Sequence, residues 1–320
     1  MCECGQLHNN AKRLTVDQDP TRQGRNRSKA EKELYRRMAG AAAEIKRYIL
    51  AIPVSKRTVP DNNNLLMNRE VYQYGSESYA QFRQFTIEVI NRWFELGGSG
   101  KPPQWFFDQQ VRAAYESGAA ETIGMIALLL ALLPRKRTML EISFEMIVGT
   151  YDYEQRVKYS LEQGYNSVTK FGNDIAADVA RTVGEAMDNN RSPEALAGAM
   201  AVVFSKARSR AKQIGENEIN NAYRAARKRE AEALAEALNL NIKVLHRSAL
   251  LPTTRAWHAA RHGRIYTIQA QALWWSQDAN AVNCHCSVSE VIVDNDGKVY
   301  DLGMQKKLIA QRQSYFGLAA

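Results

Sequence analysis

Apolar residues recur every three or four positions through most of the chain as far as Leu238, which is the spacing of one face of an α-helix. Ser28 and Glu31 have the spacing of a capping box, so the first helix is expected to begin at Ser28 and to end before Pro53. Its apolar face comprises Leu34, Met38, Ala41, Ala42, Ile45, Ile49 and Leu50. Further helices are expected over residues 78–96, 104–133, 138–148, 152–188 and 193–238.

Strand patterns replace the helical ones near the C-terminus. Residues 242–245 and 287–293 are rich in valine and isoleucine, and the second run meets residues 298–300 across Asp296 and Gly297, a pair that favours a hairpin turn. The expected fold class is therefore mainly α, with a helical N-terminal region followed by a small α+β C-terminal domain.

Polar and turn-forming segments set the expected limits of these regions. Residues 1–27 have little apolar periodicity, whereas residues 53–76 contain two prolines and three consecutive asparagines and are predicted to form a surface loop. The expected organisation is a basic flexible arm over 1–27, a helical region over 28–190, a C-terminal domain over 191–303 and a tail over 304–320.

The composition is that of a folded protein with a basic surface. Of 320 residues, 45 % are hydrophobic and 24 % are charged, and the formal net charge of +9 favours acidic partners such as nucleic acid, an anionic membrane surface or an acidic protein face. The basic excess is concentrated near the start of the chain. These residues either bind DNA or the capsid wall or simply form a solvated surface. The candidate nucleic-acid contacts there are Arg22, Arg25, Arg27 and Lys29.

Neither export nor stable membrane insertion is expected. The first ten residues lack a cationic start followed by an apolar run, so no signal peptide is predicted and the chain is expected in the cytoplasm. The longest apolar run, from Ile123 to Leu133, stops at Pro134 and is shorter than the roughly 20 residues that a spanning helix needs. It is expected to form a buried helix.

Three short motifs follow one another in the last third of the chain. The first is the helical segment 214–227, which contains Glu218; the second is an R-x-x-H-x-x-x-x-G pattern from Arg255 through His258 to Gly263. The third is Asn283-Cys284-His285-Cys286, which an apolar strand follows. In this order and spacing the motifs resemble those of the phage Mu protein F-like family of head morphogenesis proteins. The chain differs from the family pattern at Glu216, Asn217 and His285, where the family commonly has arginine, threonine and arginine.

The resemblance implies a role in virus assembly. Members of the family are low-copy virion proteins that associate with the portal vertex, and some are thought to accompany the genome out of the particle. It therefore implies a minor head protein of a tailed bacteriophage, with its family domain over 191–303, made in the host cytoplasm and located in the virion inside the capsid or at the portal vertex. The implied partners are the portal protein, the major capsid protein and phage DNA. The chain itself is expected to have no enzymatic activity and no cofactor. The residues with a structural motif role would then be Glu218, Arg255, His258, Gly263, Asn283, Cys284 and Cys286.

The four cysteines form two Cys-x-Cys pairs, Cys2 with Cys4 and Cys284 with Cys286. A reducing cytoplasm argues against structural disulfides. Incidental thiols on a mobile arm are the simpler interpretation of the first pair, although all four thiols meeting across the termini is an alternative.

Two interpretations of the second pair remain open. Arg255 and His258, which share a helical face, can hydrogen-bond the Asn283–Cys286 turn and close the small domain. Alternatively, His258, Cys284 and Cys286 bind zinc, with His262 or His285 as the fourth ligand.

The zinc interpretation leads to an alternative function, a zinc-dependent hydrolase or nuclease in which Glu218 is the general base. The sequence contains no HExxH, Walker A or nucleophile-elbow motif, so this alternative depends on the single His/Cys cluster.

Overall fold

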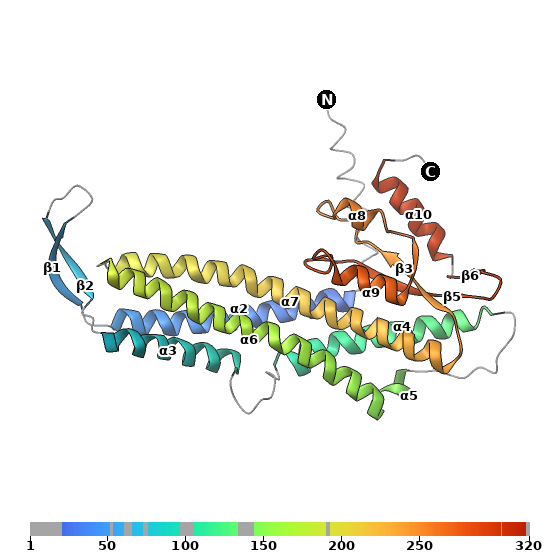
Figure 1. Cartoon of the computed structure of the whole chain (residues 1–320), viewed down its shortest axis with the longest axis horizontal. Helices are drawn as coiled ribbons and strands as arrows, with labels where there is room; N and C mark the ends of the chain where they lie inside the picture. The colour runs from blue at the N-terminus through green and yellow to red at the C-terminus, as the bar shows by residue number, and fades with distance from the viewer. Residues whose placement is uncertain are drawn as a thin grey trace. The chain divides into compact units, whose positions relative to one another are not determined.

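The structure, a computed structural model, describes residues 21–51, 54–60, 66–72, 76–96, 105–133, 144–189, 193–301 and 303–317. It is mainly α, with a small antiparallel sheet near the C-terminus (Figure 1), which confirms the predicted fold class. The helices before the sheet are α2 (Thr21–Ala51), α3 (Ser76–Phe94), a short π-helix (Phe107–Val111), α4 (Arg112–Leu130), α5 (Phe144–Ile147), α6 (Tyr151–Asp188) and α7 (Pro193–Ala237).

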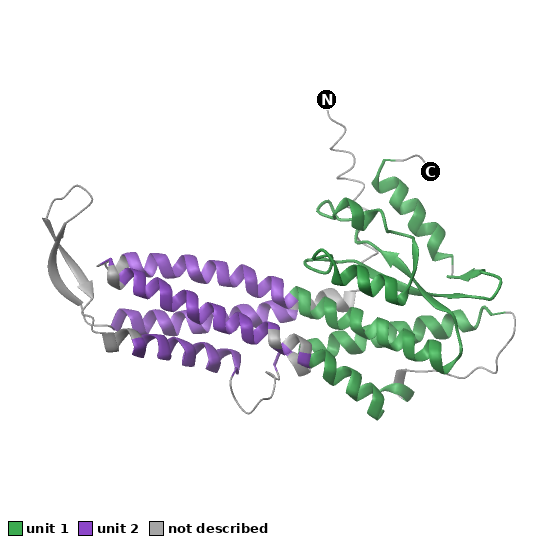
Figure 2. Ribbon diagram, in the orientation of Figure 1, with its two compact units in different colours: residues 1–28, 108–161, 216–320 green, residues 29–107, 162–215 purple. Residues whose placement is uncertain are grey.

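The chain forms two compact units, which cut across the predicted domain limits (Figure 2). One unit contains Lys29–Phe107 and Glu162–Gly215, and the other contains Asp108–Leu161 and Glu216–Ala320 together with the described residues before Lys29. The long helices α6 and α7 each contribute residues to both units. The sequence patterns did not indicate this division, because helical periodicity continues through both helices without a break.

Unit 2 of Figure 2, residues 29–107 and 162–215, is mainly helical, with a core built from the predicted face of α2. Leu34, Ala41 and Ile45 are fully buried, whereas Leu50, which was expected on the same face, is 58 % exposed. Leu50 directly follows the buried Ile49 and is therefore turned about 100° away from the stripe. Aromatic rings from other helices join this core, and the ring of Phe94 meets that of Phe171 edge-on.

Two local predictions in this part of the chain were wrong. Residues expected in a surface loop form an antiparallel hairpin of β1 (Val54–Pro60) and β2 (Leu66–Tyr72), paired from Val54 with Tyr72 to Pro60 with Leu66. The two strands pair through their backbones, which does not require an alternating apolar pattern, so that signal was missing. Helix α2 also begins at Thr21 rather than Ser28, which places the last part of the predicted flexible arm in a helix; its polar residues gave no periodicity to detect.

Unit 1 of Figure 2, the sheet-containing unit, is built around a sheet with the strand order β4-β3-β5-β6. Its strands are β3 (Ile242–Arg247), β4 (Ile265–Thr267), β5 (Ser287–Val293) and β6 (Val299–Tyr300), all antiparallel. One face packs on α4 and α7 through Ile126, Leu234 and Ile292. The opposite face packs on α10 (Met304–Tyr315) through Leu308 and Val291 (Figure 1). The central strand β5 is buried along its whole length.

Helix α10 corrects the prediction of a C-terminal tail over 304–320. Asp301 caps its first turn by accepting hydrogen bonds from the backbone N–H groups of Gly303 and Gln305, at 3.0 and 2.6 Å. The helix comes so close to the turn at Gly263 that a Cβ there would lie 2.9 Å from the backbone nitrogen of Ile309. Gly263 also has φ +78°, a left-handed conformation that favours glycine.

The apolar run from Ile123 to Leu133 lies in α4 and the turn after it, and Ile123, Ile126 and Leu129 are buried against the sheet. Within the described residues, the search for a helix of sufficient length and apolar character to cross a bilayer finds none.

Candidate functional site

The three sequence motifs lie together in the sheet-containing unit. The first lies on α7, the second on α8 (Ala256–Ala259) and the turn after it, and the third on the segment that leads into β5. The third segment is the meeting point, because the other two motifs make hydrogen bonds to it.

Helix α7 holds the backbone of the third motif with three polar side chains. The side-chain oxygen of Asn217 accepts a hydrogen bond from the backbone nitrogen of Asn283 at 2.9 Å, and Asn220 donates to the Cys284 carbonyl at 3.2 Å. Arg224 donates to the carbonyls of Cys284 and Cys286. Residues 217, 220 and 224 share one helical face, a spacing that could have revealed them in the sequence but that also fits a solvated surface.

Helix α8 approaches the same segment from the other side. Arg255 is its N-cap residue and donates from Nη2 to the Val282 carbonyl at 3.0 Å. His258 is only 2 % exposed. His258 packs against the Asn283–Cys286 turn as expected, whereas the hydrogen bond of Arg255 goes to Val282, the residue before the turn.

The ring of His258 lies beside both thiols of the turn. Its Nδ1 is 3.5 Å from Cys284 Sγ and 3.5 Å from Cys286 Sγ. All three side chains are buried, and their ligand atoms lie within 4.8 Å of one another. The indole of Trp274 packs against the imidazole with ring centroids 4.7 Å apart, which fixes the orientation of the ring.

The two cysteine thiols differ in pKa. The pKa of Cys284 lies well below that of an ordinary thiol, first because Cys286 donates a hydrogen bond to its sulfur, and further because His258 and the positive Arg224 stabilise the thiolate against the cost of burial. The same interaction, together with burial, raises the pKa of Cys286.

Neither residue expected as a fourth zinc ligand joins this group. His262 Nδ1 accepts a hydrogen bond from the backbone nitrogen of Ser248 at 2.9 Å, and its Nε2 lies 3.1 Å from Gln311 Oε1, so both ring nitrogens are engaged elsewhere. His285 is exposed between two buried cysteines. The side chains of Cys284 and Cys286 are buried beside His258, whereas that of His285 is exposed and is not part of this group of ligand atoms.

A pocket of about 190 Å³ opens beside the cluster. It is lined by Ala249, Leu251, Thr253, Thr254, Arg255, His258, Asn283, Cys284, His285 and Cys286. None of these described lining residues has a carboxylate, and Glu218, the proposed general base of the hydrolase alternative, is not among them.

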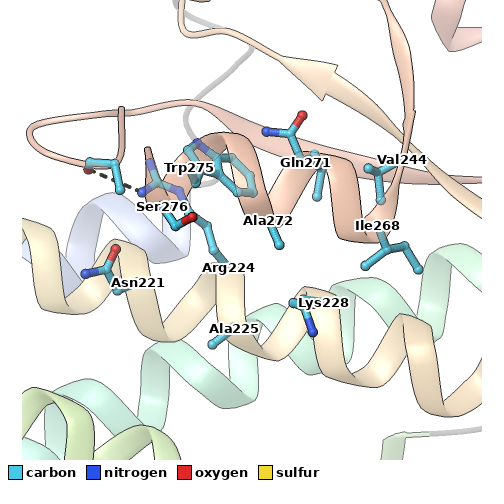
Figure 3. A pocket seen from close by; sticks show the side chains of 12 residues that line it. Asn221, Arg224, Ala225, Lys228, Val244, Ile268, Gln271, Ala272, Trp275 and Ser276 are labelled. Atoms are coloured by element: carbon cyan, nitrogen blue, oxygen red, sulfur yellow. Dashed lines mark hydrogen bonds between the residues drawn. The ribbon is translucent and has the colours of Figure 1, made fainter. Parts of the chain in front are cut away.

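A second, more apolar pocket of about 280 Å³ lies between α7 and α9 (Ile268–Ser276) (Figure 3). The guanidinium of Arg224 lies over the ring of Trp275, 4.8 Å from its centroid, so Arg224 contacts this pocket and the cysteine turn together. Ile268 and Ala272 form part of its apolar wall.

The remaining predicted residues lie away from the cluster or outside the described side chains. Arg22, Arg25 and Arg27 lie on α2, but only Lys29 of the basic group has a described side chain, which is exposed. Cys2 and Cys4 lie outside the described residues.

No family model, curated protein or solved structure matches this chain.

Proposed function

We propose that the chain is a minor head protein of a tailed bacteriophage, with a structural and assembly role inside the capsid near the portal. The observation that carries the proposal is the convergence of the three motifs. They are far apart in sequence, but their residues join in one hydrogen-bonded cluster around the turn before β5. A resemblance based on three separate motifs is more specific when the motifs form one site.

The arrangement supports a structural role for these motifs. The side chains of Asn217, Asn220, Arg224 and Arg255 make hydrogen bonds to backbone groups of the segment before β5 and so join α7 and α8 to the central strand. The four strands of the sheet and helix α8 are each seven residues long or less, so local hydrogen bonding alone gives them little independent stability. Polar cross-links between distant segments fix their geometry.

Contact with the genome is the part of the proposal that depends on charge. A second basic group on α7 is already engaged within the protein: Arg210 pairs with Asp174, Lys212 with Glu31, and Arg208 stacks on Tyr35. The basic residues near the start of α2 are therefore the better candidates for DNA contact.

Binding to the portal tests the assembly role. The full-length chain would be co-expressed with the portal protein of the same phage and fractionated by size-exclusion chromatography. We expect co-elution with the portal ring, and co-elution should survive in His258→Gln if the cluster has only a structural role within this chain. Separate elution of the two proteins at low and moderate salt would contradict portal association.

A zinc-dependent hydrolase or nuclease is the second candidate, favoured by one observation. The His258, Cys284 and Cys286 cluster forms part of the wall of a pocket, as a catalytic metal site requires. The described lining residues supply no carboxylate to act as a general base, which makes this the weaker candidate.

A further inference from the structure

We propose that His258, Cys284 and Cys286 bind one zinc ion, with the fourth coordination position directed to the adjoining pocket. This inference concerns the chemistry of the cluster and does not depend on the phage assignment. It stands on the distances, on the hydrogen-bonding capacity of the imidazole and on the way the turn is held.

The distances fit a tetrahedral ion. With Zn–S bonds of about 2.3 Å and Zn–N bonds of about 2.0–2.1 Å, a nitrogen and a sulfur ligand lie about 3.6 Å apart. His258 Nδ1 is 3.5 Å from each of the two sulfur atoms. One ion can therefore occupy the position between the three atoms with little side-chain movement.

Hydrogen bonding alone does not account for the equal distances from His258 Nδ1 to the two sulfur atoms. A ring nitrogen of neutral histidine has either one N–H or one lone pair, so Nδ1 can make one good hydrogen bond to one of two equidistant thiols. A cation at the centre interacts with all three ligand atoms at once. It also allows both buried sulfurs to be thiolates, since two negative charges balance the charge of Zn²⁺.

The turn is held so that both sulfurs face the histidine. Asn217, Asn220 and Arg224 fix its backbone from α7, and both cysteine sulfurs lie beside the imidazole of His258. A Cys-x-Cys pair in this conformation provides two ligands without the two-residue turn of a zinc knuckle. Such outer partners are the groups that orient ligands in metal sites.

Arg255 changes its contacts in the loaded site. Its Nη1 lies 3.4 Å from His258 Nε2, where a guanidinium can only donate. Zinc on Nδ1 requires a proton on Nε2, which would then face another donor. We expect this long contact to open while the 3.0 Å bond from Nη2 to the Val282 carbonyl remains. Arg255→Gln supplies an acceptor for the Nε2 proton and should retain the metal.

Metal analysis of the full-length protein, expressed without a polyhistidine tag, tests the proposal. We expect about one zinc per chain. Substituting cobalt should produce thiolate-to-cobalt absorption and the visible bands of a tetrahedral ion. Cys284→Ser and His258→Gln should lose the zinc. In the cobalt experiment the same variants should show weaker thiolate-to-cobalt absorption than the wild type.

Two control variants distinguish the loss of a zinc ligand from unfolding and from metal binding by the other two cysteines. The double variant Cys2→Ser/Cys4→Ser removes the other Cys-x-Cys pair, and His262→Gln alters a buried histidine outside the cluster; both should retain one zinc. Circular dichroism of each variant reports folding. The proposal is overturned if the folded wild-type protein takes up no zinc at micromolar concentration, or if zinc is retained in Cys284→Ser but lost in Cys2→Ser/Cys4→Ser. Either result leaves the portal test unaffected.

Discussion

Arg227 and Glu290 form an ion pair buried on both sides, with 3 % and 0 % of their side chains exposed. Glu290 also accepts a hydrogen bond from Thr122 at 2.9 Å, and Arg227 donates to Glu121 at 2.8 Å. This network joins α4, α7 and β5. Burial opposes the charged form of Arg227, and the pKa is nevertheless raised because Glu290 is so close.

Removing one member of the pair should be costly. Glu290→Leu leaves the Arg227 charge without its main partner and should lower the free energy of unfolding by about 3–5 kcal/mol. The double variant Arg227→Met/Glu290→Leu removes both charges and should lose less than the sum of the single variants. Urea unfolding of the three variants measures this, and additive losses would show that the pair is not coupled.

Buried histidines make the stability sensitive to acid. Burial lowers the pKa of His262 to about 4 and that of His246 to about 3. The unfolded chain binds these protons near pH 6.5, so each neutral histidine contributes stability that is complete above pH 6.5 and is lost as the pH falls towards the folded pKa.

His262→Gln isolates one of these contributions. Gln can still accept from the Ser248 N–H but does not titrate, so the loss of stability between pH 7 and pH 5 should be smaller than in the wild type, by up to about 1.4 kcal/mol per pH unit below 6.5. Unfolding midpoints at several pH values measure it. An unchanged pH slope would mean that His262 titrates normally in the folded protein.

At the level of elements, α10 completes the sheet-containing unit. Leu308 is 3 % exposed and packs with Leu245 and Val291 on the sheet face opposite α4 and α7. Arg312 donates to the His262 carbonyl at 2.8 Å, which ties the helix to the turn that follows α8.

Leu308→Ala should therefore destabilise this unit by about 2–5 kcal/mol, since it removes buried methyl groups and leaves a cavity. Lys307→Ala, at the neighbouring exposed position, is the matched control and should change stability little. Hydrogen exchange of β3 and β5 locates the effect. Equal protection in the two variants would mean that α10 is not part of the folded core.

The polar face of α7 is expected to set the metal affinity of the cluster. Arg224→Lys keeps the charge but loses the planar group that reaches the Cys284 and Cys286 carbonyls, so zinc affinity should fall by about tenfold or more. Competition with a chromophoric chelator gives the affinity. Wild-type affinity in Arg224→Lys would remove this residue from the positioning role.

The sequence predicted the elements and candidate ligands that leave a pattern among neighbouring residues of the chain. Buried faces such as that of α2 follow from helical periodicity, and His258, Cys284 and Cys286 belong to short motifs. Asn217, Asn220 and Arg224 were missed because polar residues on a helix usually face solvent. His262 and His285 were proposed as ligands by residue type alone, whereas burial and competing hydrogen bonds, which depend on the tertiary structure, decide which histidine meets the cysteines.

At the scale of the whole molecule, the net charge of +9 is the property most relevant to genome contact. Replacing Arg22, Arg25, Arg27 and Lys29 by glutamine should weaken binding to duplex DNA and reduce its salt dependence, because fewer counterions are released. A control with equal charge loss replaces the exposed Lys158, Lys170, Lys206 and Lys306. Fluorescence anisotropy at rising salt compares them, and equal affinities for both variants would place the DNA contact elsewhere.

Enzymatic turnover separates the structural role from the hydrolase alternative. The zinc-loaded full-length protein should cleave neither DNA nor peptide in a way that His258→Gln abolishes, because no carboxylate is present among the described residues that line the pocket. Cleavage lost in that variant, with folding retained by circular dichroism, would establish the hydrolase.

The most direct test of the proposal that this chain is a minor head protein is quantitative mass spectrometry of purified phage particles produced from the genome that encodes it. Intact virions, particles emptied of DNA and isolated portal complexes would be compared. A minor head protein should be present in intact virions at a few copies per portal ring, far below the major capsid protein, and a loss from emptied particles would show that it leaves with the genome. Absence of the chain from intact virions and portal complexes, despite its expression during infection, would contradict the assignment.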